Sequence, residues 1–137
     1  MEAPFKTDNI AGEKIEAIAI EVWDQNNNGL DWVTKVFIQT TKETLVISVN
    51  PDLDKLELKT ESAINKPIAS DKETSIVSVD ATAPFSNLLD KRIVWIWTLT
   101  NNQGYQDDAQ IEVADGQYRK RIQFMAEGSQ IKVYRLK

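Results

Sequence analysis

The sequence has 137 residues, the length of one domain, and its 42% hydrophobic and 27% charged residues are typical of a globular chain. Its formal net charge of -5 argues against a general affinity for nucleic acid, because phosphates require a basic surface. It contains neither cysteine nor histidine, so disulfides, thiolate metal sites and serine–histidine or cysteine–histidine catalysis cannot be built from it.

The first half of the chain shows the alternation of strands. Ile18, Ile20 and Val22 lie on one face of the first apolar segment, with small or polar residues between them. Turn-forming residues such as Asn28, Gly29 and Pro51 separate the segments. The predicted strands span residues 14–23, 32–40, 45–49 and 55–60.

Residues 61–91 form a long crossover without a sustained period. Within it we expect a short strand at 74–79 and a short helix over 84–90, where apolar residues at helical spacing follow Pro84. The strand pattern then resumes, with strands predicted over 92–100, 109–113, 118–126 and 131–136.

The two halves match at an offset of 75 residues. This offset places Val36 on Ile111 and Ile47 on Ile122, and one extra residue in the second loop places Trp23 on Trp97. The sequence therefore predicts a single, mostly β domain over 1–137. It consists of two four-strand antiparallel meanders related by an internal repeat (14–60 and 92–137), which form a sandwich or a barrel-like sheet.

The segment 92–100 is apolar on both faces when its alternation is counted without a break. Ile93, Trp95, Trp97 and Leu99 then share one face, and Val94 and Ile96 share the other. Such a strand is expected to be central and covered on both sides, and apolar residues of the crossover would supply the cover. The candidates for this cover are Ile64, Ile68, Ile76, Val77, Phe85, Leu88 and Leu89.

The most distinctive polar segment, 101–108, follows two tryptophans and ends in paired carboxylates. Amides, a phenol and acids beside an aromatic surface suit the recognition of a ligand or of another protein. A loop that only bonds its own backbone is the alternative. The candidate binding residues are Trp97, Asn101, Asn102, Gln103, Tyr105, Asp107 and Asp108.

Three other motifs are interpreted as structural. Residues 24–29 resemble the opening of a calcium loop, but the position of its last ligand is held by Lys35, so no metal site is expected. Asp107 and Asp108 offer paired acids for a hydrolase, although acids are common at strand ends. The run 119–121 (Arg-Lys-Arg) is expected to form a solvated strand edge rather than a phosphate site.

The block from Trp95 to Asp107, together with residues 47–52 (Ile-Ser-Val-Asn-Pro-Asp) and 131–134 (Ile-Lys-Val-Tyr), resembles a family of small bacterial domains of unknown function. Members of that kind sometimes lie near toxin–immunity loci. The resemblance implies no catalytic residues, and it favours a role in protein interaction.

These observations lead to one main hypothesis and two alternatives. We expect a non-enzymatic, immunity-like bacterial interaction module that uses no cofactor and binds another protein. The first alternative is a small-ligand-binding barrel or sandwich, and the second is a hydrolase. No apolar run approaches the roughly 20 residues of a spanning helix, so we expect a cytoplasmic location and no contact with membranes.

Overall fold

The computed structural model describes residues 10–23, 33–50, 55–62, 74–80, 85–100, 106–127 and 130–136. Nearly all of this described part is extended, as the alternation of the sequence predicts. The elements are β1 (Ile15–Trp23), β2 (Val33–Thr40), β3 (Glu43–Asn50), β4 (Lys55–Ser62), β5 (Thr74–Ser78), η2 (Phe85–Asn87), β6 (Arg92–Thr100), β7 (Gln106–Asp115), β8 (Tyr118–Glu127) and β9 (Gln130–Leu136).

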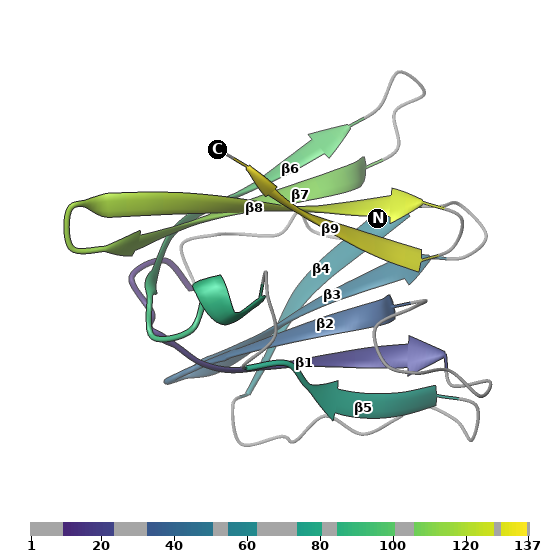
Figure 1. Cartoon of the computed structure of the whole chain (residues 1–137). Coiled ribbons are helices and arrows are strands. Elements are labelled where there is room, and N and C mark those ends of the chain that lie inside the picture. Colours follow the sequence, from purple (N-terminus) through teal and green to yellow (C-terminus); the bar gives the residue numbers. More distant parts are fainter. Residues whose placement is uncertain are drawn as a thin grey trace.

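The strands form two antiparallel sheets that face each other (Figure 1). The first sheet has the order β4-β3-β2-β1-β5 and the second the order β6-β7-β8-β9. This arrangement confirms the predicted mostly β fold with two meanders. It also decides between the two predicted forms, because the described strands make two separate sheets and no closed barrel.

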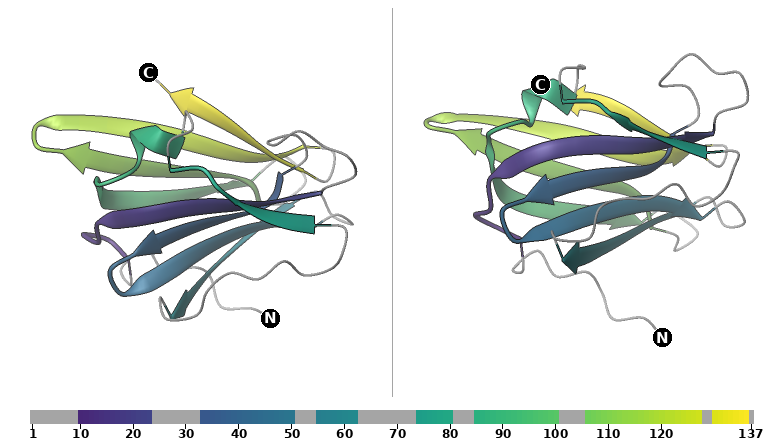
Figure 2. Two further views of the ribbon diagram at one scale, coloured as in Figure 1. Left: turned by 60° about the horizontal axis from the view of Figure 1, so that its bottom comes forward. Right: turned by 90° about the horizontal axis from the view of Figure 1, so that it is seen from below.

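The core fills the space between the sheets. Strand β4 packs against β7 and β8, while β2 and β3 pack against β9, and the further views in Figure 2 show the two layers. Each strand contributes every second residue to this core, which is why the alternation identified the strands so well. The largest fully buried side chains include Phe124, Ile18, Ile20, Ile38, Leu45, Ile47, Ile111 and Ile122.

The central hairpins of the two meanders pair in the same register. Val36 lies opposite Ile47, and their counterparts Ile111 and Ile122 lie opposite each other. The flanking ladders are shifted by two residues relative to the sequence alignment, which matches Ile20 with Val94. Ile20 lies opposite Val36, but the residue opposite Ile111 is Ile96 and not Val94. A shift of two preserves the buried face of each strand, and the internal repeat stays a prediction that the common register supports.

The described part of the crossover extends the first sheet and does not cover the outer face of the second; Ile64 and Ile68, two of the predicted cover residues, lie outside the described residues. Strand β5 pairs with β1, with Ile20 opposite Val77. The helix expected over 84–90 is a single 3-10 turn, η2, which lies between the sheets and buries Phe85 and Leu88 in the core (Figures 1 and 2). No helix in the described part of the chain is long and apolar enough to cross a membrane.

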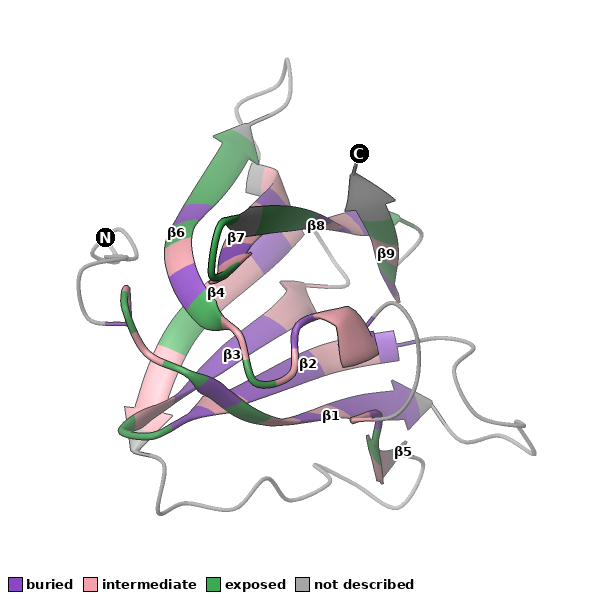
Figure 3. Ribbon diagram, turned by 60° about the vertical axis from the view of Figure 1, so that its left-hand side comes forward, coloured by how far each residue is buried: buried purple, intermediate pink, exposed green. Residues whose placement is uncertain are grey.

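A β-bulge at Val94 changes the faces of β6. The pairing passes from Ile93 opposite Val113 directly to Trp95 opposite Glu112, so Val94 has no partner across the ladder. Ile93 and Ile96 are therefore both in the core, while Trp95 and Trp97 face outward. The predicted central, doubly covered strand is wrong: β6 is at one end of its sheet, and Figure 3 shows much of it exposed.

This register of β6 can be tested by truncating Ile96. Ile96 is 3% exposed and belongs to the core, so Ile96→Ala should lower the free energy of unfolding by about 2–5 kcal/mol, the usual cost of such a cavity. Urea unfolding measures the change, and Thr98→Ala, an exposed position on the same strand, is the matched control. A loss below about 1 kcal/mol for Ile96→Ala would show that its side chain does not face the core.

Candidate functional site

The outer face of the second sheet carries most of the exposed large hydrophobic side chains in the described part of the chain. Trp95, Trp97 and Leu99 occupy alternate positions of β6 and are 41%, 37% and 38% exposed, and Tyr134 on β9 is 43% exposed. They face outward because the bulge at Val94 shifts the alternation of β6 by one residue. We call this outer surface of β6–β9 the aromatic face.

The strand pairing arranges the aromatic face in three cross-strand rows. Residues directly opposite one another in an antiparallel pair are close enough for their side chains to touch. The first row holds Trp95, Glu112 and Arg121; the middle row Trp97, Gln110, Gln123 and Tyr134; and the third row Leu99, Asp108, Met125 and Lys132.

An ion-pair cluster fixes the first row. The Glu112 carboxylate accepts a hydrogen bond of 3.0 Å from a guanidinium nitrogen of Arg121 and another of 3.0 Å from Arg119. These two hydrogen bonds lower the pKa of Glu112, so its charge is held at neutral pH. The guanidinium carbon of Arg121 lies 4.8 Å from the centre of the Trp97 ring, a cation–π contact that joins the cluster to the aromatic strand.

The run 119–121 is thus not a sheet edge. Strand β8 lies between β7 and β9, and Arg119 and Arg121 stand on the aromatic face, where both bind Glu112. The split of the run between two faces agrees with the prediction, because Lys120 alternates with the two arginines. The predicted edge role is wrong, and the arginines belong to the candidate site.

Acidic groups gather at the opposite end of the face. Gln123 donates a hydrogen bond of 2.7 Å to Asp108, whose other carboxylate oxygen is buried and has no hydrogen-bond partner. Burial raises the pKa of Asp108, and the adjacent Asp107 raises it further. The Tyr134 hydroxyl donates a hydrogen bond of 2.7 Å to Glu127, and this bond raises the pKa of Tyr134.

Three of the seven candidate binding residues lie in the described part of the chain. Trp97 is exposed on β6, whereas Asp107 and Asp108 lie in β7 and not in a loop, since that strand begins at Gln106. The other four, Asn101, Asn102, Gln103 and Tyr105, lie outside the described residues and stay predictions. The calcium-like segment 24–29 also lies outside them, and the described residues contain no group of three or more acids that could hold a metal ion.

Sequence reasoning missed Trp95, Leu99, Glu112 and Arg121 as members of one surface. Trp95 and Leu99 were assigned to a covered face because alternation was counted through Val94 without a break. The sign in the sequence was the more polar character of the repeat-related segment, where Ala19, Glu21 and Trp23 correspond to Ile93, Trp95 and Trp97.

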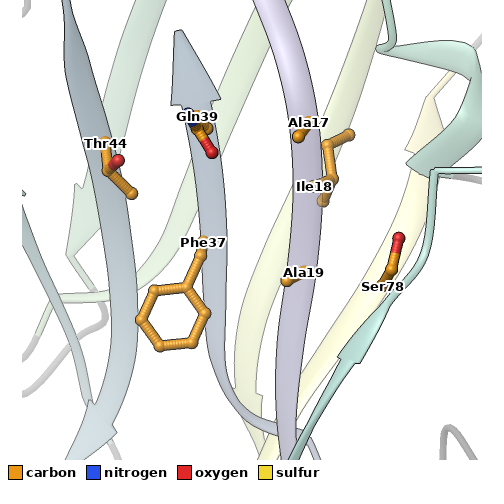
Figure 4. Close-up of a pocket in the computed structure, with 7 residues that line it drawn as sticks. All are labelled: Ala17, Ile18, Ala19, Phe37, Gln39, Thr44 and Ser78. Carbon is orange, nitrogen blue, oxygen red and sulfur yellow. The ribbon is translucent and has the colours of Figure 1, made fainter. Parts of the chain in front are cut away.

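A second candidate is a shallow depression on the outer face of the first sheet (Figure 4). It measures about 140 Å³, well below the roughly 300–1,000 Å³ of typical small-molecule pockets. Small residues on β1 form its floor beside a large ring from β2. Its lining consists of Ala17, Ile18, Ala19, Phe37, Gln39, Thr44 and Ser78.

The acidic end of the aromatic face yields a pH-dependent prediction. The pKa of Asp108 is higher in the folded than in the unfolded chain. The folded state therefore loses stability as the pH rises from the pKa of the unfolded chain through the pKa of the folded chain. Asp108→Asn removes this loss and keeps an acceptor for Gln123. It should stabilise the protein at pH 7 by up to about 1 kcal/mol, the scale of one hydrogen bond.

Urea unfolding at a series of pH values measures this gain, which should vanish near pH 3, where Asp108 is protonated in both states. Glu16→Gln, at an exposed position of β1, is the control for a general effect of charge removal. A variant that is destabilised at pH 7, or equally stabilised at all pH values, would contradict the assignment.

Comparison with known proteins gives a family but no function. Neither the curated proteins nor the solved structures include a match to this chain. A family model matches residues 1–137, the whole sequence. The chain therefore belongs to a family of unknown function, DUF6334.

Proposed function

We propose that this domain is a non-enzymatic protein-interaction module and that the aromatic face is its contact surface. The observation that carries the proposal is the exposure of Trp95, Trp97 and Leu99, three large apolar side chains at alternate positions of one strand. Apolar side chains scattered singly on a surface are ordinary, but a contiguous patch rimmed by polar groups is characteristic of interaction sites.

The chemistry of the face suits a protein partner. Tryptophan, tyrosine and arginine are the residues most enriched among those that dominate protein interfaces, and the face combines Trp95, Trp97, Tyr134 and Arg121. The amides of Gln110 and Gln123 lie between them, where they can bond a partner's polar groups.

The face is also held in place before any partner binds. Arg121 is fixed on one side by Glu112 and on the other by the Trp97 ring, so less side-chain entropy is lost on association. All four strands that carry the face are paired within one sheet, which gives a more rigid platform than a loop would.

The finer parts of the proposal come from the sequence. An immunity-like role in a bacterial cell, in which the domain neutralises a partner protein by binding it, is the form that the family resemblance favours. The cytoplasmic location belongs to the same proposal. Nucleic acid and membranes are not proposed as partners, because the net charge of -5 is unfavourable for anionic surfaces.

The two alternatives have less support. The depression on the first sheet is small, and it lies outside the interface between the meanders where a ligand was expected. For a hydrolase, Asp107 and Asp108 lie together at the start of β7, where Asp107 contributes to the raised pKa of Asp108. This raised pKa is the observation in favour of a hydrolase, and the Asp108 carboxylate already accepts a hydrogen bond from Gln123.

The proposal is tested with the double variant Trp95→Thr/Trp97→Thr, since threonine keeps the β-propensity of β6. Wild type and variant are used as immobilised baits in an extract of the native host. Any partner retained by the wild type is then purified and titrated by calorimetry. We expect saturable binding by the wild type and a loss of affinity of at least about tenfold in the variant.

The matched control is Lys59→Thr/Glu61→Thr, which changes an exposed ion pair on β4 in the other sheet and should bind as the wild type does. Arg121→Ala is a second, milder variant should the tryptophan variant unfold. A purified partner that binds the wild type and both aromatic-face variants equally would refute the proposal.

A further inference from the structure

The two ends of the aromatic face carry charges of opposite sign. At the end where β6 and β8 begin, three described side chains are cationic and one is anionic, which leaves a charge of +2; they are Arg92, Arg119, Arg121 and Glu112. At the other end two described side chains are anionic and one is cationic, which leaves -1; they are Asp108, Glu127 and Lys132. We call the first group the cationic end.

The acid of the cationic end lies beneath its arginines. The Glu112 side chain is only 14% exposed, whereas those of Arg119 and Arg121, which both bond it, are 62% and 44% exposed. A guanidinium has more N–H donors than the one that each of these arginines gives to Glu112. An approaching partner therefore meets guanidinium groups and not the carboxylate.

Arg92 adds a third cation at the margin of the face. It lies across Ala114 from Arg119, so only a small side chain stands between the two arginines on the sheet. Arg92 donates one hydrogen bond of 3.1 Å to the carbonyl oxygen of Gly12 and keeps further donors. Both arginines are exposed, and Figures 1 and 2 show the nearby β7–β8 turn projecting past the first sheet. This end is therefore accessible to a partner.

Local charge decides which group can bind here. At physiological ionic strength charges are screened over about 8 Å, so the net charge of -5 of the whole chain acts only weakly at this end. An extended polyanion such as nucleic acid would need a long row of cations, which this short cluster does not supply. A single carboxylate needs only a few guanidinium donors, with which it forms short charge-assisted hydrogen bonds.

The neighbouring apolar residues determine what must accompany the carboxylate. Trp95 lies two strand spacings from Arg121, about 10 Å, and Trp97 contacts the Arg121 guanidinium. An extended chain covers this distance in about three residues. A partner that packs a large apolar side chain on the tryptophans thus brings residues about three positions away over the arginines.

We propose that the partner of the aromatic face presents an acidic segment: an Asp or Glu that binds the cationic end, within about three residues of a large apolar side chain that packs on Trp95 and Trp97. This inference rests on the proposed function, because it names the chemistry of the partner of the same surface. A basic segment is disfavoured, since its cations would meet the exposed guanidinium groups at this end.

The test is a selection from a random peptide library displayed on phage, with the immobilised chain as bait. Selected peptides that lose binding to Trp95→Thr/Trp97→Thr are sequenced, synthesised and titrated by calorimetry. We expect these peptides to be enriched in Asp and Glu close to a large apolar residue. Their affinity should fall as salt is added, because exposed charges are screened.

Neutralising one arginine tests the assignment to this end. Arg119→Gln should weaken these peptides by about three- to tenfold, the range from an exposed ion pair to a charge-assisted hydrogen bond, while Glu112 keeps its bond to Arg121. Lys120→Gln is the matched control, because it removes the same charge from the next residue, which is exposed and points to the other face. Arg92→Gln is a second variant should Arg119→Gln unfold, and thermal unfolding of each variant shows whether the chain still folds.

Either of two results would overturn the inference: tryptophan-dependent peptides without an excess of acids, or a loss of affinity in Arg119→Gln no larger than in Lys120→Gln. An excess of Lys or Arg in these peptides would also overturn it and would assign a basic partner. All of these results would leave the proposed function intact, because binding would still need the tryptophans. If no selected peptide depended on Trp95 and Trp97, the inference and the proposed function would both be refuted.

Discussion

The bulge at Val94 decides what the second sheet presents to its surroundings. One unpaired residue in β6 lets Ile93 and Ile96 both enter the core and turns Trp95, Trp97 and Leu99 outward. Without it, uninterrupted alternation would keep Ile93 on the same face as the tryptophans and remove either Ile93 or Ile96 from the core. The contact of Arg121 with Trp97, and hence the link between the ion-pair cluster and the aromatic strand, depends on this outward position.

The elements of the fold were predictable because burial between two sheets forces apolar residues into every second position. Strands such as β2 and β4 were therefore predicted to within a residue or two of their observed ends. The placement of β5 was not predictable, since a short segment such as Thr74–Ser78 carries no sign of which edge it will join. The sequence predicts a helix over 84–90, where the structure has only the 3-10 turn η2. The spacing of Phe85 and Leu88 fits both kinds of helix.

The candidate site was predictable only in part. The sequence named Trp97 as a candidate binding residue because it precedes a polar segment, but it assigned the same residue to a covered face. In the structure Trp97 is 37% exposed. It could not show that Glu112 and Arg121 face Trp97, because that relation depends on the register of two ladders and on a bulge that leaves no mark in the alternation. Asp107 and Asp108 were attributed to a loop because polar residues at the start of a strand look the same as the end of a turn.

Equivalent ladder positions hold different kinds of side chains in the two sheets. Ala19 pairs with Phe37 and Glu21 with Lys35 in the first sheet. When the central hairpins are taken as the reference, and not the sequence alignment that matches Trp23 with Trp97, the pairs at the same ladder positions in the second sheet are Trp95 with Glu112 and Trp97 with Gln110. At these positions the first sheet has a small residue and a buried acid, Glu21, bonded to Thr34. A sheet of this kind thus folds without tryptophan there. This comparison supports the proposal that the large exposed residues of β6 serve binding rather than folding.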